Sequence, residues 1–490
     1  MTVSLDGRSL TLNAAVAVVG GESVRLDPAS LKRMKKFRSL LEGKLARGEV
    51  VYGVNTGFGS LSDKPIRPGN IRELQLNLIR SHSAGVGGHM PEGVVRAAML
   101  IRLNSLLKGH SAVRTEVAEM LSSMLNRGVT PHVPKFGSLG ASGDLVPSAH
   151  MALTMLGEGS AEFHGRCIES SKALGAAKLR PIVLEAKEGL SLINGTCFTT
   201  ALASNVVHSG KVILETGNSS VSLAGDVLGA CSQSFDARLV GMKNNGGQDY
   251  VSKQIRTMLE GSRRVRSSPV PQDPYSIRCA PQVHGALKDA LGFAERLTVE
   301  EMNSVSDNPV ILENGTVLHG GNFHAQPVAM ALDLLSFALA TLGVMSLART
   351  GALLTKTSPE RKYMARRPGL ESGLMILQYT ATALSAENAK EIYPVSAYPA
   401  SVSSGVEDHA SFGVTAGLKA LTIARNVSRI LAIEMICASN LPGPQLQGLS
   451  PHSRRTLATV RGISPLLSRD RPMADEIERL AFEVISGKLI

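Results

Sequence analysis

Three of the smallest amino acids, Ala141, Ser142 and Gly143, lie between a glycine turn and the expected start of a helix, in GSLGASGDLVP, residues 137–147. The local pattern alone favours a loop, since Ser142 could cap the helix and Pro147 fits its first turn. A chemical role is the alternative. A tight turn could press the unhindered nitrogen of Gly143 against the carbonyl carbon of Ala141, where it adds and water is lost. Loss of a second water from Ser142 would leave a methylidene group on an imidazolone ring, an electrophile made without an external cofactor.

The elements that must position this segment are predicted to be mostly helical. Tryptophan is absent and aromatic residues make up 4% of the chain, which suits closely packed helices. Asp27 is a plausible N-cap for a helix that runs to Leu45. Residues 159–185 indicate a small hairpin and a connecting helix. Apolar periodicity predicts further helices over 70–82, 92–108, 113–127, 200–230, 281–304, 325–353, 371–390 and 412–440.

The composition of the sequence changes near residue 200, where long Ala/Leu/Val/Met patterns begin. We therefore expect an N-terminal domain over 1–200 that carries the reactive segment. Residues 201–490 are expected to form a long-helix bundle and a C-terminal domain. Polar stretches at 241–250 and 355–369 are predicted to be linkers, lids or binding loops.

Composition narrows the class of protein. The formal charge is +11 over 490 residues, but the basic residues are scattered and no aromatic residues interleave with them, so nucleic-acid binding is not expected. Five widely spaced cysteines favour reduced thiols in a cytoplasm, and the sequence contains no Cys-x-x-Cys pair that would indicate a metal site.

The N-terminus shows no signal-peptide pattern. The uncharged stretch from Leu334 to Ala348 is shorter than the roughly 18–20 residues of a membrane span, so we expect a buried bundle helix.

The segment around Ser142 resembles the signature of the ammonia-lyases and aminomutases that make 4-methylideneimidazole-5-one (MIO) from Ala-Ser-Gly and act on histidine, phenylalanine or tyrosine. Other blocks resemble this family in the same order and span most of the chain. They are YGVNTGFG at 52–59, LSLINGT at 190–196, QDPYSIR at 272–278, SDNP at 306–309 and GGNFH at 320–324. Six ordered blocks are specific evidence, where one glycine-rich loop would be weak.

The resemblance implies an elimination of ammonia from an α-amino acid, with MIO from Ala141, Ser142 and Gly143 as the only cofactor and no metal. It implies that Tyr52 removes the β-proton; because a free tyrosine has a pKa of about 10, its anion would need stabilisation. Tyr275 would assist proton handling near MIO, and Arg278 would clamp the substrate carboxylate. Matches to family positions also place four residues at the ring or substrate: Asn194, Gln272, Phe323 and His82. Taken singly, four of these side chains would more often be core packing or satisfied polar groups: Tyr275, Asn194, Gln272 and Phe323.

Two positions bear on the substrate. Ser81-His82 stands where enzymes for phenylalanine tend to be apolar, which points to a polar ring. Glu407 matches a carboxylate of members that act on histidine, and it could hold an imidazole N–H by a charge-assisted bond. A structural ion pair is the alternative for Glu407. We expect L-histidine to be converted to trans-urocanate.

Tyrosine stays open as the substrate, in an ammonia-lyase or a tyrosine 2,3-aminomutase, because several such enzymes resemble the Ser-His pair too. The chain also departs from the family at Val406, where Gln is usual, and at Gln326, where histidine enzymes usually have Glu. The loop 355–369 lacks the usual Leu-Pro-Pro-Phe stretch.

The family's fold is similar to that of fumarase and aspartase: mostly α-helical, with a long central bundle and a smaller α(+β) N-terminal domain that carries MIO. The resemblance implies a cytoplasmic homotetramer whose active sites take residues from several subunits, with a small amino acid as ligand and no membrane or nucleic-acid partner.

A different class of protein stays as an alternative: a non-catalytic helical binding protein in which Ala-Ser-Gly is only a helix cap. Intact mass separates the two, because a mature chain is two waters lighter than its sequence.

Overall fold

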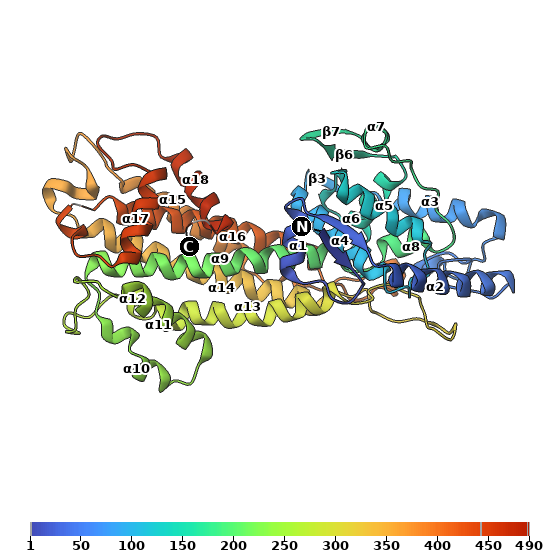
Figure 1. Cartoon of the computed structure of the whole chain (residues 1–490), viewed down its shortest axis with the longest axis horizontal. Coiled ribbons are helices and arrows are strands. Elements are labelled where there is room, and N and C mark those ends of the chain that lie inside the picture. Colours follow the sequence, from blue (N-terminus) through green and yellow to red (C-terminus); the bar gives the residue numbers. More distant parts are fainter. Residues whose placement is uncertain (1, 442, 488, 490) are drawn as a thin grey trace. The chain divides into compact units, whose positions relative to one another are not determined.

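The computed structural model describes residues 2–441, 443–487 and 489, and it is mostly helical (Figure 1). Two compact units divide the chain. Unit 1 contains residues 1–205, 295–332 and 394–418, and unit 2 contains 206–294, 333–393 and 419–490. Unit 1 thus includes two segments beyond residue 205, and the expected domain boundary near 200 stays a prediction.

Unit 1 is built from short helices and small sheets. Its helices are α1 (Leu12–Val19), α2 (Pro28–Ala46), α3 (Ile71–His82), α4 (Glu92–Leu106), α5 (Thr115–Asn126), α6 (Leu145–Met155), α7 (Ser170–Ala176) and α8 (Glu188–Ile193). Its strands are β1 (Thr2–Leu5), β2 (Ser23–Leu26), β3 (Val86–His89), β4 (Thr130–Pro131), β5 (Pro134–Phe136), β6 (Ser160–Phe163), β7 (Arg166–Glu169), β8 (Val310–Ile311) and β9 (Val317–Leu318). Strands β1 and β2 are parallel, whereas the pairs β3–β5 and β8–β9 and the three-stranded sheet β4–β6–β7 are antiparallel.

The core of unit 1 is centred on α4, in which every residue from Val94 to Leu106 is buried. A helix buried on all sides needs neighbours around it, and α1 and α5 pack against α4. Helices α3, α6 and α8 pack against one another beside it. Together they form the scaffold for the loops that carry the candidate site.

Unit 2 contains most of the long helices. Helices α9 (Cys197–Leu228), α13 (Ala280–Met302), α14 (Gln326–Thr355) and α16 (Gly413–Ser439) have the greater part of their length in it. The shorter helices are α10 (Ala237–Gly241), α11 (Gly246–Leu259), α12 (Tyr275–Arg278), α15 (Met375–Glu391), α17 (Pro451–Ile463) and α18 (Ala474–Ser486). Small residues allow the long helices to approach closely: a Cβ added to Gly210 of α9 would lie 2.8 Å from Leu291 of α13. Short 3-10 helices complete the two units at Gly59–Leu61, Pro68–Asn70, Ser232–Phe235, Pro359–Met364, Val395–Ala397, Ser403–Gly405 and Gly443–Leu446.

The helices predicted from periodicity are confirmed, with ends that differ by a few residues. Asp27 caps α2 as predicted, since its side chain accepts a hydrogen bond from the backbone N–H of Ser30. The predicted linker at 241–250 is wrong in its second half, because α11 begins at Gly246. The side chain of Asn245 accepts from the N–H of Gln248, and this cap starts a helix in a stretch that looks polar and irregular.

Helix α14 is, among the described residues, the one helix long and apolar enough to cross a membrane by length and composition. In its most apolar window, 61% of the residues are buried inside the protein. Core helices of globular proteins pass the same test. The stretch from Leu334 to Ala348 is thus part of a bundle helix as predicted, but it is only partly buried, because Leu334, Phe337 and Val344 are exposed along one face.

A buried ion pair joins two long helices of unit 2. The guanidinium of Arg349 donates to both carboxylate oxygens of Glu434, with Nε–Oε1 at 2.6 Å and Nη2–Oε2 at 2.9 Å, and both side chains are fully buried. The hydroxyl of Ser346 donates to the same carboxylate, and Arg349 also donates to the carbonyl of Ser276.

We expect Glu434→Gln to lower the free energy of unfolding by about 3–5 kcal/mol, because it leaves a buried cation without its counter-charge. Urea unfolding followed by circular dichroism measures the effect. The matched control is Glu387→Gln, which removes an exposed partner of Lys390 in the same unit and should change little. Equal midpoints for the two variants would contradict the prediction.

Candidate active site

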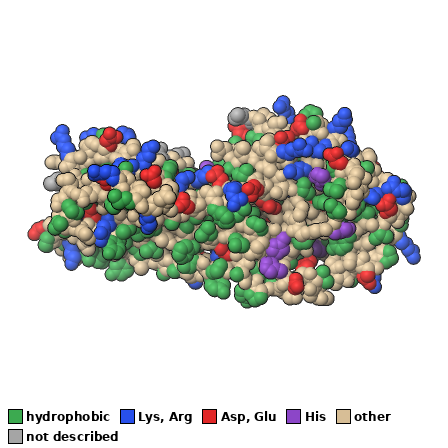
Figure 2. Space-filling model, turned by 90° about the horizontal axis from the view of Figure 1, so that it is seen from below, with side chains coloured by type: hydrophobic (Ala, Val, Ile, Leu, Met, Phe, Trp, Pro, Cys, Tyr) green, Lys and Arg blue, Asp and Glu red, His purple; other side chains and the backbone are tan. Residues whose placement is uncertain are grey.

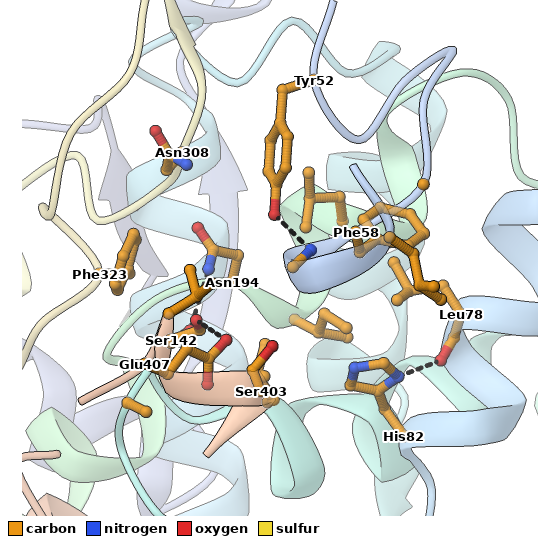
Figure 3. A pocket seen from close by; sticks show the side chains of 18 of the residues that line it. Tyr52, Phe58, Leu78, His82, Ser142, Asn194, Asn308, Phe323, Ser403 and Glu407 are labelled. Atoms are coloured by element: carbon orange, nitrogen blue, oxygen red, sulfur yellow. Dashed lines mark hydrogen bonds between the residues drawn. The ribbon is translucent and has the colours of Figure 1, made fainter. Parts of the chain in front are cut away.

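A cavity of about 820 Å³ lies within unit 1. Its wall is formed by the loop after Tyr52, the start of α6, α8 and the segments 308–324 and 403–409. Helix α3 contributes one face at helical spacing: Leu74, Asn77, Leu78, Ser81 and His82. Figure 3 shows labelled side chains from these segments pointing toward a common centre.

Ala141 and Ser142 line the cavity, and Gly143 lies against Gly195. Gly143 has a φ of +80°, and a Cβ added to it would be 2.4 Å from the carbonyl oxygen of Gly195. The next residue, Asp144, donates its N–H to that same oxygen at 2.7 Å. Any larger residue at position 143 would therefore be excluded by both space and backbone conformation.

Asn194 holds the middle of the tripeptide. Its Nδ2 donates to the carbonyl oxygen of Ser142 at 2.9 Å, while its buried Oδ1 has no hydrogen-bond partner among the residues that the structure describes. The Ser142 hydroxyl donates to Oε1 of Glu407 at 2.9 Å (Figure 3). The narrow cradle at Gly143 and the unpaired Asn194 oxygen fit a backbone that rearranges into a ring.

Asp144 is fully buried beneath this segment and anchors it to the start of α9. Its two carboxylate oxygens accept from the N–H and the hydroxyl of Thr199, at 2.7 and 2.8 Å. Burial raises the pKa of Asp144 to about 6, against the lowering effects of the Thr199 hydrogen bonds and the charge of Arg102. Arg102, itself buried, donates to the carbonyl of Asn194 at 3.0 Å.

Tyr52 lies across the cavity from Ser142 in Figure 3. Its hydroxyl oxygen accepts the backbone N–H of Gly59 at 2.9 Å, which closes the loop on itself. The ring of His319 meets that of Tyr52 edge-on, with centroids 6.0 Å apart. This hydrogen bond fixes the position of the Tyr52 hydroxyl at the cavity wall.

His82 ends α3, and its ring points into the cavity (Figure 3). The hydroxyl of Ser81 donates to the carbonyl oxygen of Leu78, and Nδ1 of His82 lies 2.9 Å from that oxygen and 3.0 Å from the hydroxyl. Because a carbonyl can only accept, Nδ1 carries the proton. Burial lowers the pKa of His82, whereas the Leu78 contact and the charge of Glu407 raise it. The neutral ring therefore presents Nε2 as an acceptor.

Of the site residues predicted from the sequence, the cavity brings together Tyr52, His82, Ala141, Ser142, Asn194, Phe323 and Glu407. Gly143 follows Ser142 in unit 1 and lies against Gly195. The other three predicted residues belong to unit 2: Gln272 and Tyr275 are exposed, and Arg278 stacks on the Tyr275 ring at 4.5 Å. Asp273 fixes their segment, since it accepts from the N–H of Cys231 at 2.7 Å and pairs with Arg266.

Sequence reasoning missed several lining residues, among them Leu78, Asn308, Ser403, His324 and His409. His409 and His324 contact each other, with Nδ1–Nε2 at 3.2 Å. His324 and Asn308 lie inside blocks that had been singled out, and His409 lies two residues after Glu407. Their closeness in sequence to those blocks is the signal by which these residues could have been predicted to line the site.

The chain belongs to the aromatic amino acid lyase family, whose model matches residues 10–461. This membership confirms the predicted family and a carbon–nitrogen lyase, and it gives no support to a non-catalytic binding protein.

Particular relatives share almost the whole chain. The histidine ammonia-lyase of Symbiobacterium thermophilum is 42% identical, with 99% of this chain and 97% of that protein covered. Among solved structures, the tyrosine aminomutase of Streptomyces globisporus has a TM-score of 0.93 at 34% identity and covers 100% of this chain and 98% of its own. The histidine ammonia-lyase of Trypanosoma cruzi has a TM-score of 0.91 at 34% identity and covers 100% and 94%. These neighbours confirm the predicted mostly α-helical fold class.

Proposed function

We propose that the protein eliminates ammonia from L-histidine to give trans-urocanate, using an MIO group formed from Ala141, Ser142 and Gly143. The observation that carries the proposal is a single cavity lined by Ala141 and Ser142 of the tripeptide, by Tyr52 and by Glu407. The name of the 42% identical Symbiobacterium relative supports histidine as the substrate.

MIO, once formed, supplies an electrophile for the substrate's amino nitrogen, which turns a poor leaving group into a better one. The residues of the chain do the rest. Tyr52, whose hydroxyl oxygen is positioned by the Gly59 N–H, takes the β-proton. Asn194 Nδ2 donates to the carbonyl oxygen of Ser142, which the ring would retain, and so would stabilise negative charge on that oxygen. The apolar wall from Leu74, Leu78 and Phe323 limits water around the reacting atoms.

Recognition of the substrate ring follows from two acceptors in the cavity. Nε2 of His82 and the Glu407 carboxylate both accept hydrogen bonds, and the charge of Glu407 acts on His82. An imidazole offers an N–H to such a group, whereas the phenyl ring of phenylalanine offers none and would leave the carboxylate unpaired.

Tyrosine is the second candidate substrate, in an ammonia-lyase or an aminomutase. A phenol O–H can also donate to His82 Nε2, and the Streptomyces neighbour is named a tyrosine aminomutase. Purified protein incubated separately with histidine, tyrosine and phenylalanine tests both candidates. Urocanate would support the first, coumarate or β-tyrosine the second, and no product from any of them would overturn the proposal.

We expect Glu407→Gln to reduce histidine turnover at least tenfold more than tyrosine turnover, because it replaces a charge-assisted bond to an imidazole with a neutral one. Rates are measured by product absorbance and expressed per matured chain, as counted by intact mass. The control is Asp408→Asn, which removes the neighbouring carboxylate of the same cavity. Equal losses on the two substrates would remove the argument for histidine.

We also propose a cytoplasmic homotetramer with shared active sites. Leu334, Phe337 and Val344 are exposed along one face of α14 at the three- and seven-residue spacing of a helix–helix seam. Figure 2 shows hydrophobic side chains gathered over the long helices of unit 2. The exposure of Gln272 and Tyr275 suits residues that complete another subunit's site.

Mixing two inactive variants, Tyr52→Phe and Arg278→Ala, tests this arrangement. Reassembled mixtures should regain part of the activity if the two residues serve one site from different subunits. A monomer in light scattering, or mixtures that stay inactive, would contradict it. Within each subunit, residues 1–200 are proposed as the MIO-bearing domain and 201–490 as the bundle and C-terminal domain.

A further inference from the structure

The hydroxyl that Ser142 must lose on cyclisation is bound to a carboxylate. Oγ of Ser142 donates to Oε1 of Glu407 at 2.9 Å, across 265 positions of sequence. Figure 3 shows the two side chains facing each other in the cavity wall. Substrate binding alone does not explain this contact, because the Ser142 hydroxyl exists only before maturation.

We propose that Glu407 is a catalytic residue of the protein's own maturation: it carries the proton with which the Ser142 hydroxyl leaves as water. The inference rests on the proposed function, since it presupposes that Ala141, Ser142 and Gly143 cyclise. It adds a second reaction for a residue otherwise assigned to the substrate.

Ring closure comes first. The nitrogen of Gly143 bonds to the carbonyl carbon of Ala141, and the Ala141 oxygen leaves as water with the amide protons of Gly143 and Ser142. This step forms the C–N bond and the ring C=N bond. It needs no proton from Glu407.

The elimination follows. Ser142 loses its Cα proton to cavity water, the electron pair forms the Cα=Cβ bond, and the Cβ–Oγ bond breaks. Glu407, protonated by that water, returns the proton to Oγ, which departs as a water molecule. The carboxylate ends in the state in which it began, so the step needs no oxidant, reductant or external reactant. Proton delivery to a leaving oxygen is ordinary general acid catalysis.

Asp144 is the nearest acid in sequence, but its contacts direct it elsewhere. Both of its oxygens accept hydrogen bonds from Thr199, and the side chain is fully buried. Glu407 is half-buried and lines the cavity, so water can reach it. Its backbone is held by a pair of hydrogen bonds with Val402, which keeps the carboxylate at Ser142.

Intact mass of the full-length chain, followed with time after synthesis, tests the proposal. Wild type should lose two waters and gain near-ultraviolet absorbance. Glu407→Gln should lose one water normally and the second roughly 100-fold more slowly, the scale of losing one acid–base group. Asp408→Asn, the matched loss of a carboxylate with no contact to Ser142 Oγ, should mature like wild type.

The outcomes separate this inference from the proposed function. A wild-type chain that keeps its full mass would overturn both. If Glu407→Gln loses both waters at the wild-type rate, only the role of Glu407 is overturned. Retention of both waters by a folded Glu407→Gln variant would also overturn that role, because the carboxylate would then act on ring closure. Should Glu407→Gln fold poorly by circular dichroism, Glu407→Asp decides: its shorter carboxylate should slow the second loss about tenfold, and an unchanged rate overturns the proposal.

Discussion

Replacing Ser142 with alanine should abolish the near-ultraviolet absorbance and lower kcat by roughly a thousandfold or more, the scale seen when a covalent catalytic group is removed. Alanine has no Oγ to lose, so the methylidene carbon cannot form whatever the ring does. The fold should survive, because the hydroxyl's described partner is Glu407, a half-buried side chain on the cavity wall. Intact mass, absorbance and steady-state turnover of the same preparation measure the three effects.

Ser138→Ala is the matched control, four positions earlier in the same glycine-rich loop. Within the described part of the chain, its buried hydroxyl has no hydrogen-bond partner, and Ser138 is not among the residues that line the cavity. This variant should lose both waters and keep its turnover. A Ser142→Ala enzyme that works at the wild-type rate would show that the tripeptide is only a helix start.

Tyr52→Phe should reduce kcat by about 10²–10⁴-fold, the contribution of a positioned general base. The substitution removes one oxygen and leaves the ring, so the packing against His319 is kept. Because the lost group acts on the β-proton rather than on binding, KM should change little. Slow chemistry should also raise the isotope effect measured with β-deuterated substrate.

The matched control is Tyr398→Phe, which removes the hydroxyl of an exposed tyrosine of unit 1 that packs edge-on against Phe412. It should leave kcat and the isotope effect unchanged. Maturation of Tyr52→Phe should be complete by mass, which separates a catalytic loss from a failure to cyclise. A Tyr52→Phe enzyme within twofold of wild type would assign the β-proton to another base.

Much of the fold follows from local pattern. The periodicity of small and apolar residues predicts the long helices, since a helix places every third or fourth side chain on one face. Asp27 caps α2 because a carboxylate at that position satisfies a backbone N–H within three residues. The helix start at Gly246 was missed, since one Asn cap in a glycine-rich polar stretch gives a weak signal.

The candidate site likewise has features that follow from local sequence and features that depend on tertiary packing. The sequence by itself determined which residues can react: a tripeptide small enough to cyclise, a tyrosine in a glycine loop and a carboxylate that suits an imidazole. These depend on residue type and on near neighbours along the chain.

Only the tertiary structure decided what those residues do to one another. The Glu407 contact with Ser142, the Asn194 bond to the Ser142 carbonyl and the Gly195 wall against Gly143 join segments that are distant in sequence. The exposure of Nε2 on His82 depends on which atoms already occupy Nδ1. Such contacts are set by the packing that closes long loops, and no local periodicity carries that information.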